Sequence, residues 1–400
     1  MLMMKALKHA AIFRLWMGQA LSSIGDEIYR VGLTWLAVQL IGADAGYLNA
    51  SQSAALMILS FVGGKWADHW DPLKTMFRVD LIRGFIILIP VAVSFFTKVP
   101  FSLLVIVAII LSGLGAFFDP ALQTLLPQFC PNTQILRAAT GLMSTTIRMA
   151  RMVGPGIVGL LAGVVPPIHF FTLDAISFFF SATSVRSLGR SAPQPIPKRA
   201  RSTFTEAIMS GFYAVKKQPG IEFVVLSKAI TGCTWNIAYG LGFALRVQEL
   251  TPNDTRSFGL LIASYGVGNF LGALYFGNLE RTRPALMMFA GYVWLGVGFL
   301  LISRCPSIAW MLPITVITGF SGTMNEVTFA DIVQARFPVD EISRIFRFRM
   351  ATDTAATLFL MLLSPMLFRL IFSTKCFCNL RSHLGVRRSL RSHPISIVDR

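Results

Sequence analysis

Residues 63–74 read GGKWADHWDPLK, and this polar stretch separates two long apolar runs. The run before it is SAALMILSFV (residues 53–62), and the run after it includes FRVDLIRGFIILIPVAV (residues 77–93). A helix of about 20 apolar residues is long enough to cross the hydrocarbon core of a bilayer, which is about 30 Å thick. Two carboxylates, two lysines and a helix-breaking proline between such runs indicate a short polar loop that joins two membrane-crossing helices.

The whole chain has the composition of a membrane protein. Of its 400 residues, 54% are hydrophobic and only 14% are charged, and the mean hydropathy is +0.63. Soluble domains carry about 25% charged residues, so most of this protein's surface does not suit water. The apolar runs are long and continuous, whereas a membrane barrel has short segments of alternating polarity. We therefore predict an all-α polytopic membrane protein.

Eleven apolar spans follow one another along the chain. They cover residues 12–40, 47–65, 76–96, 101–124, 138–163, 168–186, 221–245, 256–278, 284–303, 307–330 and 347–373. The longest connection contains SAPQPIPKRARS (191–202), which is rich in proline, serine and basic residues, as linkers are. We expect an N-terminal six-helix bundle (1–186), a cytoplasmic central linker (187–220) and a C-terminal bundle of five helices (221–373).

Basic residues are distributed unevenly between the two sides of these spans. If the N-terminus is cytoplasmic, the cytoplasmic segments hold twenty Lys and Arg residues and the external loops hold four. This asymmetry follows the positive-inside rule and predicts a multi-pass protein of the lipid bilayer with a cytoplasmic N-terminus. Topology also accounts for the net charge of +17, so we expect no nucleic-acid partner.

Short motifs recur in the two halves of the chain. Three sets of residues match in order: Phe118, Gln123 and Pro127 with Phe329, Gln334 and Pro338; Ser51 and Gly64 with Ser264 and Gly277; and Gly154-Pro155 with Ser364-Pro365. Their offsets are nearly constant, between 210 and 213 residues. This pattern indicates two parallel six-helix repeats, an arrangement found in one large transporter fold.

The second repeat lacks a counterpart for the span 168–186. Residues 379–397 read NLRSHLGVRRSLRSHPISI where that helix is expected, and six basic residues follow position 373. An arginine at the middle of a bilayer costs about 3 kcal/mol on insertion scales. We therefore expect eleven of twelve helices, followed by a basic non-membrane tail (374–400). A shifted or truncated reading frame would produce such a tail, and a short amphipathic surface tail is the alternative.

The opening stretch resembles the loop motif G-x-L-a-D-R-x-G-R-K of the major facilitator superfamily. Gly64 and Asp68 match this motif and Lys74 supplies a basic residue, whereas His69 and Asp71-Pro72 depart from it. By this resemblance Asp68 would belong to a cytoplasmic gating loop that latches the outward-facing state, with Lys74 and Arg137 as candidate partners. The alternative is a plain loop that only sets topology.

The span 138–163 carries a second motif. Its sequence GPGIVG, with Gly154, Pro155, Gly156 and Gly159, resembles the antiporter motif G-P-x-x-G-G of exporters in the same superfamily. Small residues let helices approach closely, and proline bends a helix. The resemblance favours export over uptake, and the alternative is ordinary helix packing that implies no direction.

The likeness to the superfamily covers about residues 10–373. Within it the chain resembles bacterial exporters of the enterobactin-exporter or transmembrane secretion effector branch. The stretches that carry this likeness are FRLWMGQALSSIGDEIYRVGLTWLAVQL (13–40), FDPALQTLLP (118–127), GPGIVG (154–159) and FFTLDAISFFFSA (170–182). The resemblance implies a monomeric transporter of the bacterial inner membrane, whose two bundles rock about a central site and exchange protons for a small-molecule substrate.

Five charged residues lie near the middle of two spans. Asp26, Glu27 and Arg30 belong to the span 12–40, and Arg148 and Arg151 belong to the span 138–163. Ionised residues at that depth face a cavity or a partner rather than lipid. Asp26 and Arg30 are four residues apart and share a helix face, so we predict that they pair.

Two roles compete for these residues. Asp26 is a candidate proton carrier in a substrate cavity, or Asp26 and the arginines form a static buried network. The arginines are also suited to an anionic substrate, since guanidinium groups match carboxylates in geometry.

Other spans carry further candidates: Asp80, Arg83, Asp119, Asp174, Lys228, Glu326, Asp353, Trp235, Tyr239, Phe243 and Tyr265. We predict a local ion pair between Asp80 and Arg83, which are three residues apart. Glu326 and Asp353 are weaker candidates for proton binding. The aromatic side chains either line an apolar cavity or, as is more usual, serve in packing.

No sequence signature of an enzyme is present. The chain has no G-x-x-x-x-G-K-[ST], HExxH or G-x-S-x-G motif, so we expect neither an enzyme nor ATP as the energy source. The five cysteines lack metal-binding spacing, and we expect no cofactor and no metal site. Three hypotheses follow: a proton-coupled exporter of a siderophore or drug-like molecule, an uptake transporter of the same fold, and a non-transporting remnant without the last helix.

Overall fold

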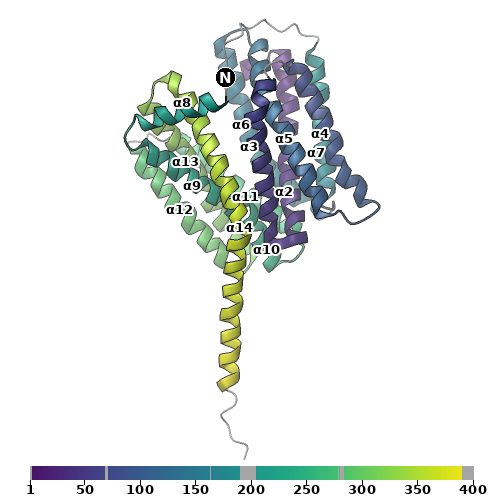
Figure 1. Cartoon of the computed structure of the whole chain (residues 1–400), viewed down its shortest axis with the longest axis vertical. Helices are drawn as coiled ribbons and strands as arrows, with labels where there is room; N and C mark the ends of the chain where they lie inside the picture. Colours follow the sequence, from purple (N-terminus) through teal and green to yellow (C-terminus); the bar gives the residue numbers. More distant parts are fainter. Residues whose placement is uncertain are drawn as a thin grey trace, which may run out of the picture.

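A computed structural model of the chain describes residues 2–67, 71–162, 164–189, 204–277, 279 and 283–389. These residues form helices joined by short turns, and no strand occurs among them (Figure 1). The predicted all-α class is therefore confirmed.

Six long helices form the first half of the chain. Their bounds are α2 (Ala10–Ile41), α3 (Ala45–Ala67), α4 (Pro72–Ser94), α5 (Phe101–Leu125), α6 (Thr133–Leu161) and α7 (His169–Leu188). The short helix α1 (Leu2–Leu7) precedes them, and the 3-10 turns η1 (Gly42–Asp44) and η2 (Leu126–Phe129) lie in connections. Within this half α2 packs against α6 and α7, and α5 packs against α3 and α4.

Five long helical segments form the second half. The first is continuous through α9 (Ile221–Asn236), the π-helical η3 (Ile237–Gly242) and α10 (Phe243–Leu250). The others are α11 (Thr255–Gly277), α12 (Pro284–Arg304), α13 (Ile308–Arg336) and α14 (Val339–Ser389). All eleven predicted spans are thus present, and no further helix follows α14 in the described part of the chain.

A helix that the sequence analysis missed lies in the predicted central linker. It is α8 (Phe204–Lys216), which packs on α14 and α9. Gly211 permits this packing, because a Cβ on it would lie only 2.5 Å from the backbone oxygen of Arg344. The neighbouring Pro/Ser/basic composition hid the short apolar pattern of this helix.

The predicted tail also differs from expectation in its first part. The last helix does not end near residue 373, because α14 continues without a break to Ser389 and runs beyond the bundle (Figure 1). Residues 390–400 of the predicted tail lie outside the described residues.

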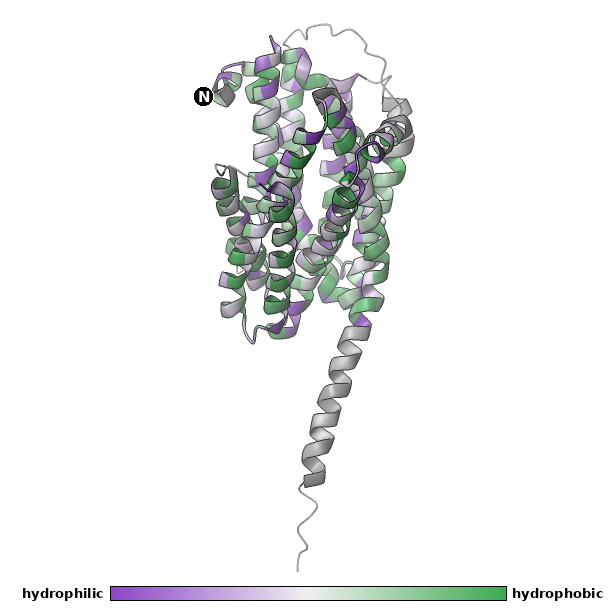
Figure 2. Cartoon of the chain, turned by 90° about the vertical axis from the view of Figure 1, so that its left-hand side faces the viewer, coloured by the Kyte–Doolittle hydropathy of each residue, from purple (hydrophilic) through white to green (hydrophobic). Residues whose placement is uncertain are grey.

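Hydrophobic residues make up much of the long helices of the bundle (Figure 2). Phe85 of α4, Phe223 of α9 and Val293 of α12 are each at least 60% exposed, as side chains that face lipid are. Among the described residues, five helical segments are long and apolar enough to cross a membrane. They lie within Ala10–Leu59, Phe101–Phe129, Thr255–Phe276, Pro284–Arg304 and Arg344–Arg369.

The two halves cross each other closely at two places. At one, Gly159 of α6 meets Gly259 of α11: a Cβ on Gly259 would lie 2.5 Å from the Gly159 nitrogen and 2.7 Å from its Cα. At the other, Gly46 of α3 meets α14, where a Cβ would lie 3.2 Å from Cδ of Pro365. Gly46 and Gly259 are separated by the same 213 residues as the repeat match Ser51 and Ser264. The two crossings therefore have equivalent places in the two repeats.

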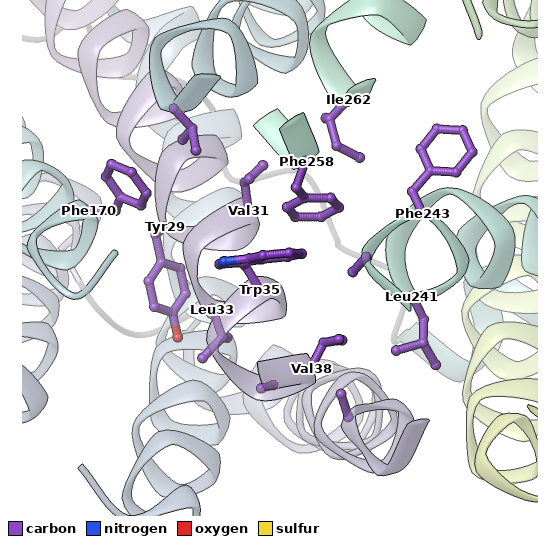
Figure 3. Packing of buried hydrophobic residues seen from close by; sticks show 14 of the residues in the cluster. Tyr29, Val31, Leu33, Trp35, Val38, Phe170, Leu241, Phe243, Phe258 and Ile262 are labelled. Carbon is purple, nitrogen blue, oxygen red and sulfur yellow. The ribbon is translucent and has the colours of Figure 1, made fainter. Parts of the chain in front are cut away.

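Further contacts join the halves at one end of the bundle. We call the end that carries α1 and the α3–α4 connection the inner end, and the opposite end the outer end. Near the outer end the buried rings of Trp35 and Phe258 stack with their centroids 5.2 Å apart (Figure 3). Two polar contacts accompany this stack: the Gln39 amide donates to Asn253 Oδ1 (3.1 Å), and Arg369 Nη2 donates to Asp44 Oδ1 (2.7 Å).

Adding a methyl group at the first crossing is expected to destabilise the protein. The new Cβ of Gly259→Ala would overlap the Gly159 backbone, and overpacking of this kind costs about 1–3 kcal/mol. We expect the midpoint of thermal unfolding in detergent to fall by about 3 °C or more. Gly156→Ala is the matched control, because its Cβ would lie 3.9 Å from Ala263. Equal midpoints for the two variants would contradict the crossing.

Candidate functional site

Glycines bring two neighbouring helices close to the middle of α2. A Cβ on Gly25 would lie 2.5 Å from Oδ1 of Asp174 in α7, and a Cβ on Gly154 in α6 would lie 2.6 Å from Cβ of Glu27. The consecutive residues Asp26 and Glu27 therefore lie in different surroundings. Glu27 lies beside α6, whereas Asp26 borders a cavity shared with α4, α5 and α7.

Glu27 is the centre of a small charged cluster. Arg30 Nε donates a hydrogen bond to Glu27 Oε2 (2.9 Å), and Arg151 Nε lies 3.7 Å from Glu27 Oε1. The predicted pairing of Arg30 with Asp26 is wrong, because the longer Glu27 side chain meets Arg30 while Asp26 borders the cavity. The cluster joins α2 to α6 through Glu27.

Positive charge is in excess around this cluster. Arg30, Arg148 and Arg151 are exposed, and Arg148 lies three residues before Arg151 on α6. Two guanidinium groups thus contact the carboxylate of Glu27, and that of Arg148 belongs to the preceding turn of α6. A surplus of this kind attracts an anion.

The second half contributes aromatic side chains opposite Arg30. Arg30 and Thr34 of α2 share a narrow crevice between the halves with Tyr239 of η3. Trp235 stacks on Tyr239 with ring centroids 4.7 Å apart, and its Nε1 donates to the Tyr265 hydroxyl (2.7 Å). The aromatic residues singled out in the sequence therefore form a packed cluster that reaches the crevice through Tyr239. π-helical turns such as η3 are frequently found at functional sites.

Asp26 borders a separate cavity inside the first half. Its volume is about 170 Å³, and its lining residues are Asp26 and Tyr29 of α2, Arg83 of α4, Leu111 and Ser112 of α5, and Asp174 and Phe178 of α7. Asp174 is fully buried, and Ser177 Oγ donates a hydrogen bond to its Oδ1 (3.0 Å). Arg83 and Asp174 are charged residues within predicted spans, and their positions in the sequence do not indicate that they share a cavity with Asp26.

Two phenyl rings hold Arg83 beside this cavity. Its guanidinium carbon lies 5.6 Å from the ring centre of Phe118 and 5.4 Å from that of Phe178, so both contacts are cation–π interactions. Asp80 is fully buried, and neither of its carboxylate oxygens has a hydrogen-bond partner. The predicted Asp80–Arg83 pair is therefore wrong, because the rings of α5 and α7 position the guanidinium instead.

The second half contains a charged network of its own. Glu326 of α13 accepts hydrogen bonds from Lys228 Nζ of α9 (2.8 Å) and from Arg349 Nη1 of α14 (2.9 Å). Arg349 Nε also lies 3.6 Å from Asp353 Oδ2, and its guanidinium carbon lies 5.1 Å from the ring centre of Phe329. Two positive and two negative groups balance here, so this network holds three helices together without net charge.

The gating-loop residues are only partly described. Asp68 lies outside the described residues, so its predicted latch stays a prediction. The described carboxylate of this connection is Asp71, whose Oδ1 accepts from the backbone nitrogens of Leu73 (3.0 Å) and Lys74 (3.4 Å) and so caps α4. Lys74 Nζ also lies 3.9 Å from Asp71 Oδ2. Gly64 belongs to α3, and Arg137 is exposed near the start of α6.

The GPGIVG motif of α6 contacts helices on two sides. Gly154 faces α2 of its own half, and Gly159 faces α11 of the other half. Pro155 is buried within the helix, and Gly156 has more space around it. The motif thus serves packing both within one half and between the halves.

Residues 4–341 match the family described as transmembrane secretion effector. The chain belongs to this family. The family and the fold place it in the major facilitator superfamily, so it is a membrane transporter of that type and not an enzyme.

Several characterised bacterial transporters are similar to the chain. The multidrug efflux pump Tap of Mycolicibacterium fortuitum is 26% identical over 316 residues, which cover 74% of each chain. The Staphyloferrin A transporter of Staphylococcus aureus is 23% identical over 78% of this chain and 79% of its own length. Macrolide efflux protein A of Streptococcus pyogenes is 21% identical over 84% of this chain and 83% of its own length.

Solved structures share the fold. A bacterial homologue of the iron transporter ferroportin in its inward-facing state gives a TM-score of 0.69 at 16% identity, covering 89% of this chain and 91% of its own. The outward-facing state of a bacterial ferroportin homologue gives 0.57, also at 16% identity, covering 89% of this chain and 92% of its own. An inward-facing bacterial homologue of the lysosomal transporter Spinster gives 0.67 at 15% identity, covering 96% of this chain and 87% of its own.

Breaking the second-half network at Glu326 is expected to destabilise the protein. Glu326→Gln leaves the Lys228 ammonium, whose side chain is 9% exposed, without its carboxylate. An unpaired buried charge is costly, so the midpoint of thermal unfolding in detergent should fall by several degrees. The double variant Lys228→Met, Glu326→Gln should recover most of this loss, because it leaves no unpaired ammonium. If the losses in midpoint caused by the two substitutions simply add in the double variant, Lys228 and Glu326 do not stabilise each other.

Proposed function

We propose that this protein is a secondary transporter that exports a small organic molecule across the bacterial plasma membrane. The observation that carries the proposal is the charged cluster of Glu27, Arg30 and Arg151, which borders the crevice between two repeated halves of a transporter fold. Two of the similar proteins are named for efflux, and a third for transport of Staphyloferrin A. A siderophore or a drug-like molecule is the substrate class that agrees with these names.

Alternating access gives a role to the contacts that join the halves at the outer end of the bundle. The Trp35–Phe258 stack and the contact between Asp44 and Arg369 join the halves at the outer end. We propose that this is the inward-facing state, with the N-terminus and the inner end in the cytoplasm. The higher TM-score against an inward-facing ferroportin homologue, 0.69 compared with 0.57, supports this assignment.

We infer that export is driven by a proton gradient and that Asp26 takes part. The chain carries no phosphate-binding loop motif, so an ion gradient is the energy source that this fold can use. Asp26 is exposed at the cavity of the first half and is next in sequence to Glu27 of the charged cluster. Protonation of Asp26 would therefore change the charge beside the substrate site.

The substrate is proposed to carry a carboxylate or another anionic group. Arg30, Arg148 and Arg151 outnumber Glu27, and guanidinium groups bind carboxylates in matched geometry. Tyr239, backed by the stacked ring of Trp235, lies on the opposite side of the crevice, where an apolar part of the molecule would contact it.

Export can be tested in energised inverted membrane vesicles with a panel of anionic, neutral and cationic organic molecules. The proposal predicts that vesicles containing the protein accumulate at least one anionic member and that collapsing the proton gradient abolishes this accumulation. Accumulation only in intact cells would indicate uptake instead. Transport of no compound in either direction would favour the non-transporting remnant.

Removing the carboxylate of Asp26 is expected to uncouple transport from the gradient. Asp26→Asn should lose gradient-driven accumulation at least about tenfold, a change of about 1.4 kcal/mol, while substrate binding stays measurable. Glu222→Gln is the control, because Glu222 is an exposed carboxylate near the start of α9. Full accumulation by Asp26→Asn would rule out the proton-carrier role.

A further inference from the structure

The two sides of α2 differ in the sign of their excess charge. On the side of α6, the Glu27 carboxylate meets the guanidinium groups of Arg30 and Arg151. On the side of α7, the cavity lining carries the carboxylates of Asp26 and Asp174 and the single guanidinium of Arg83. The side that borders the crevice is thus in excess of positive charge, and the cavity is in excess of negative charge.

Three buried polar atoms of the cavity lining have no hydrogen-bond partner. They are Oδ2 of Asp174, a residue that is 0% exposed, the hydroxyl of Tyr29, a residue that is 8% exposed, and Nε of Arg83. Leaving such atoms unsatisfied costs about 1–3 kcal/mol each, so native proteins rarely do so without a reason. All three residues line the cavity of about 170 Å³, which far exceeds the 10–15 Å³, roughly, that one water molecule needs.

We propose that this cavity is a binding site for a monovalent cation, with Asp174 as its second carboxylate beside Asp26. A proton would bind by converting one of the two carboxylates to a carboxylic acid. A sodium ion would bind with both carboxylates ionised and with the Tyr29 and Ser112 hydroxyls as further oxygen ligands. In either case one positive charge offsets the excess negative charge that the low-dielectric interior disfavours.

The helices packed against α7 present mainly acidic groups to Asp174. From α2 these are Asp26 and the Tyr29 hydroxyl, and from α4 they are Asp80 and Arg83. On α5, Asp119 lies two turns from Ser112 toward the inner end. Among the described residues no group of three acidic, His or Cys side chains is arranged to hold a metal ion, which favours a monovalent over a divalent cation.

With this site, α2 would contact a different ligand on each of two sides. The cation binds on one side of the helix, and the substrate binds on the other side through Glu27, Arg30 and Arg151. That the cation drives export rests on the proposed function, whereas its binding does not. Arg83, held between Phe118 and Phe178, serves as the fixed positive charge that limits the site to one cation.

Thermal unfolding of the purified full-length protein in detergent tests the binding without a known substrate. One series lowers the pH in choline chloride, and a second replaces choline chloride by NaCl at constant ionic strength and alkaline pH. A cation that binds only the folded state raises the unfolding midpoint, and we expect a rise of about 3 °C or more in one of the two series. The series that responds tells a proton from a sodium ion.

Variants decide whether the response belongs to this cavity. Asp174→Asn should lose the rise, and Asp353→Asn, which alters a partly buried carboxylate of the second half, should keep it. If Asp174→Asn yields no folded protein, Asp26→Asn takes its place and should lose at least about half of the rise. A wild-type protein that responds to neither cation, or an Asp174→Asn variant that responds in full, would overturn the proposal. Export without a cation response would refute this site alone, and a cation response without transport of any compound would refute the proposed function alone.

Discussion

The rest of the structure depends on the close approach of helices from the two halves at glycine positions. Lipid chains are as apolar as leucine, so membrane helices associate through close packing of small residues rather than through the hydrophobic effect. Gly159 meets Gly259 between α6 and α11, and Gly46 meets α14 beside Pro365. A contact made by backbone atoms and small side chains involves no interlocking of long side chains. It can therefore remain in place while the halves tilt, whereas the few polar contacts at the outer end break and re-form.

Glycines also place Asp26 and Glu27 of the first half beside different helices. Gly25 brings α7 onto α2, and Gly154 brings α6 onto it from another side. Because consecutive helix residues differ by about 100° in direction, Asp26 and Glu27 then belong to two different clusters. A change of charge in the cavity acts on the same short stretch of α2 that carries Glu27, the carboxylate that Arg30 and Arg151 contact. Coupling between a cation and a substrate needs no long pathway in this arrangement.

Local patterns in the sequence were sufficient to predict the spans, the repeat and the family. Hydropathy and the distribution of Lys and Arg are properties of each segment, and the recurrence of Phe118 as Phe329 needs no tertiary structure to be seen. The partner of Arg30 was not predictable in this way, since Asp26 and Glu27 are both at pairing distance along a helix. Arg83 was assigned to Asp80 because spacing along α4 cannot show the rings that α5 and α7 place around it. The helix α8 was missed because only its packing on α14 distinguishes it from the linker.

The two repeats share a framework but use charge differently. Phe118 and its counterpart Phe329 each lie under an arginine, Arg83 in the first half and Arg349 in the second. In the second half Arg349 and Lys228 are matched by Glu326 and Asp353, so that network is neutral and holds α9, α13 and α14 together. In the first half the arginine meets two carboxylates in the cavity lining, more than it can neutralise. A duplicated bundle needs its charges balanced in both copies if they serve stability alone, so the imbalance in one copy points to a ligand there.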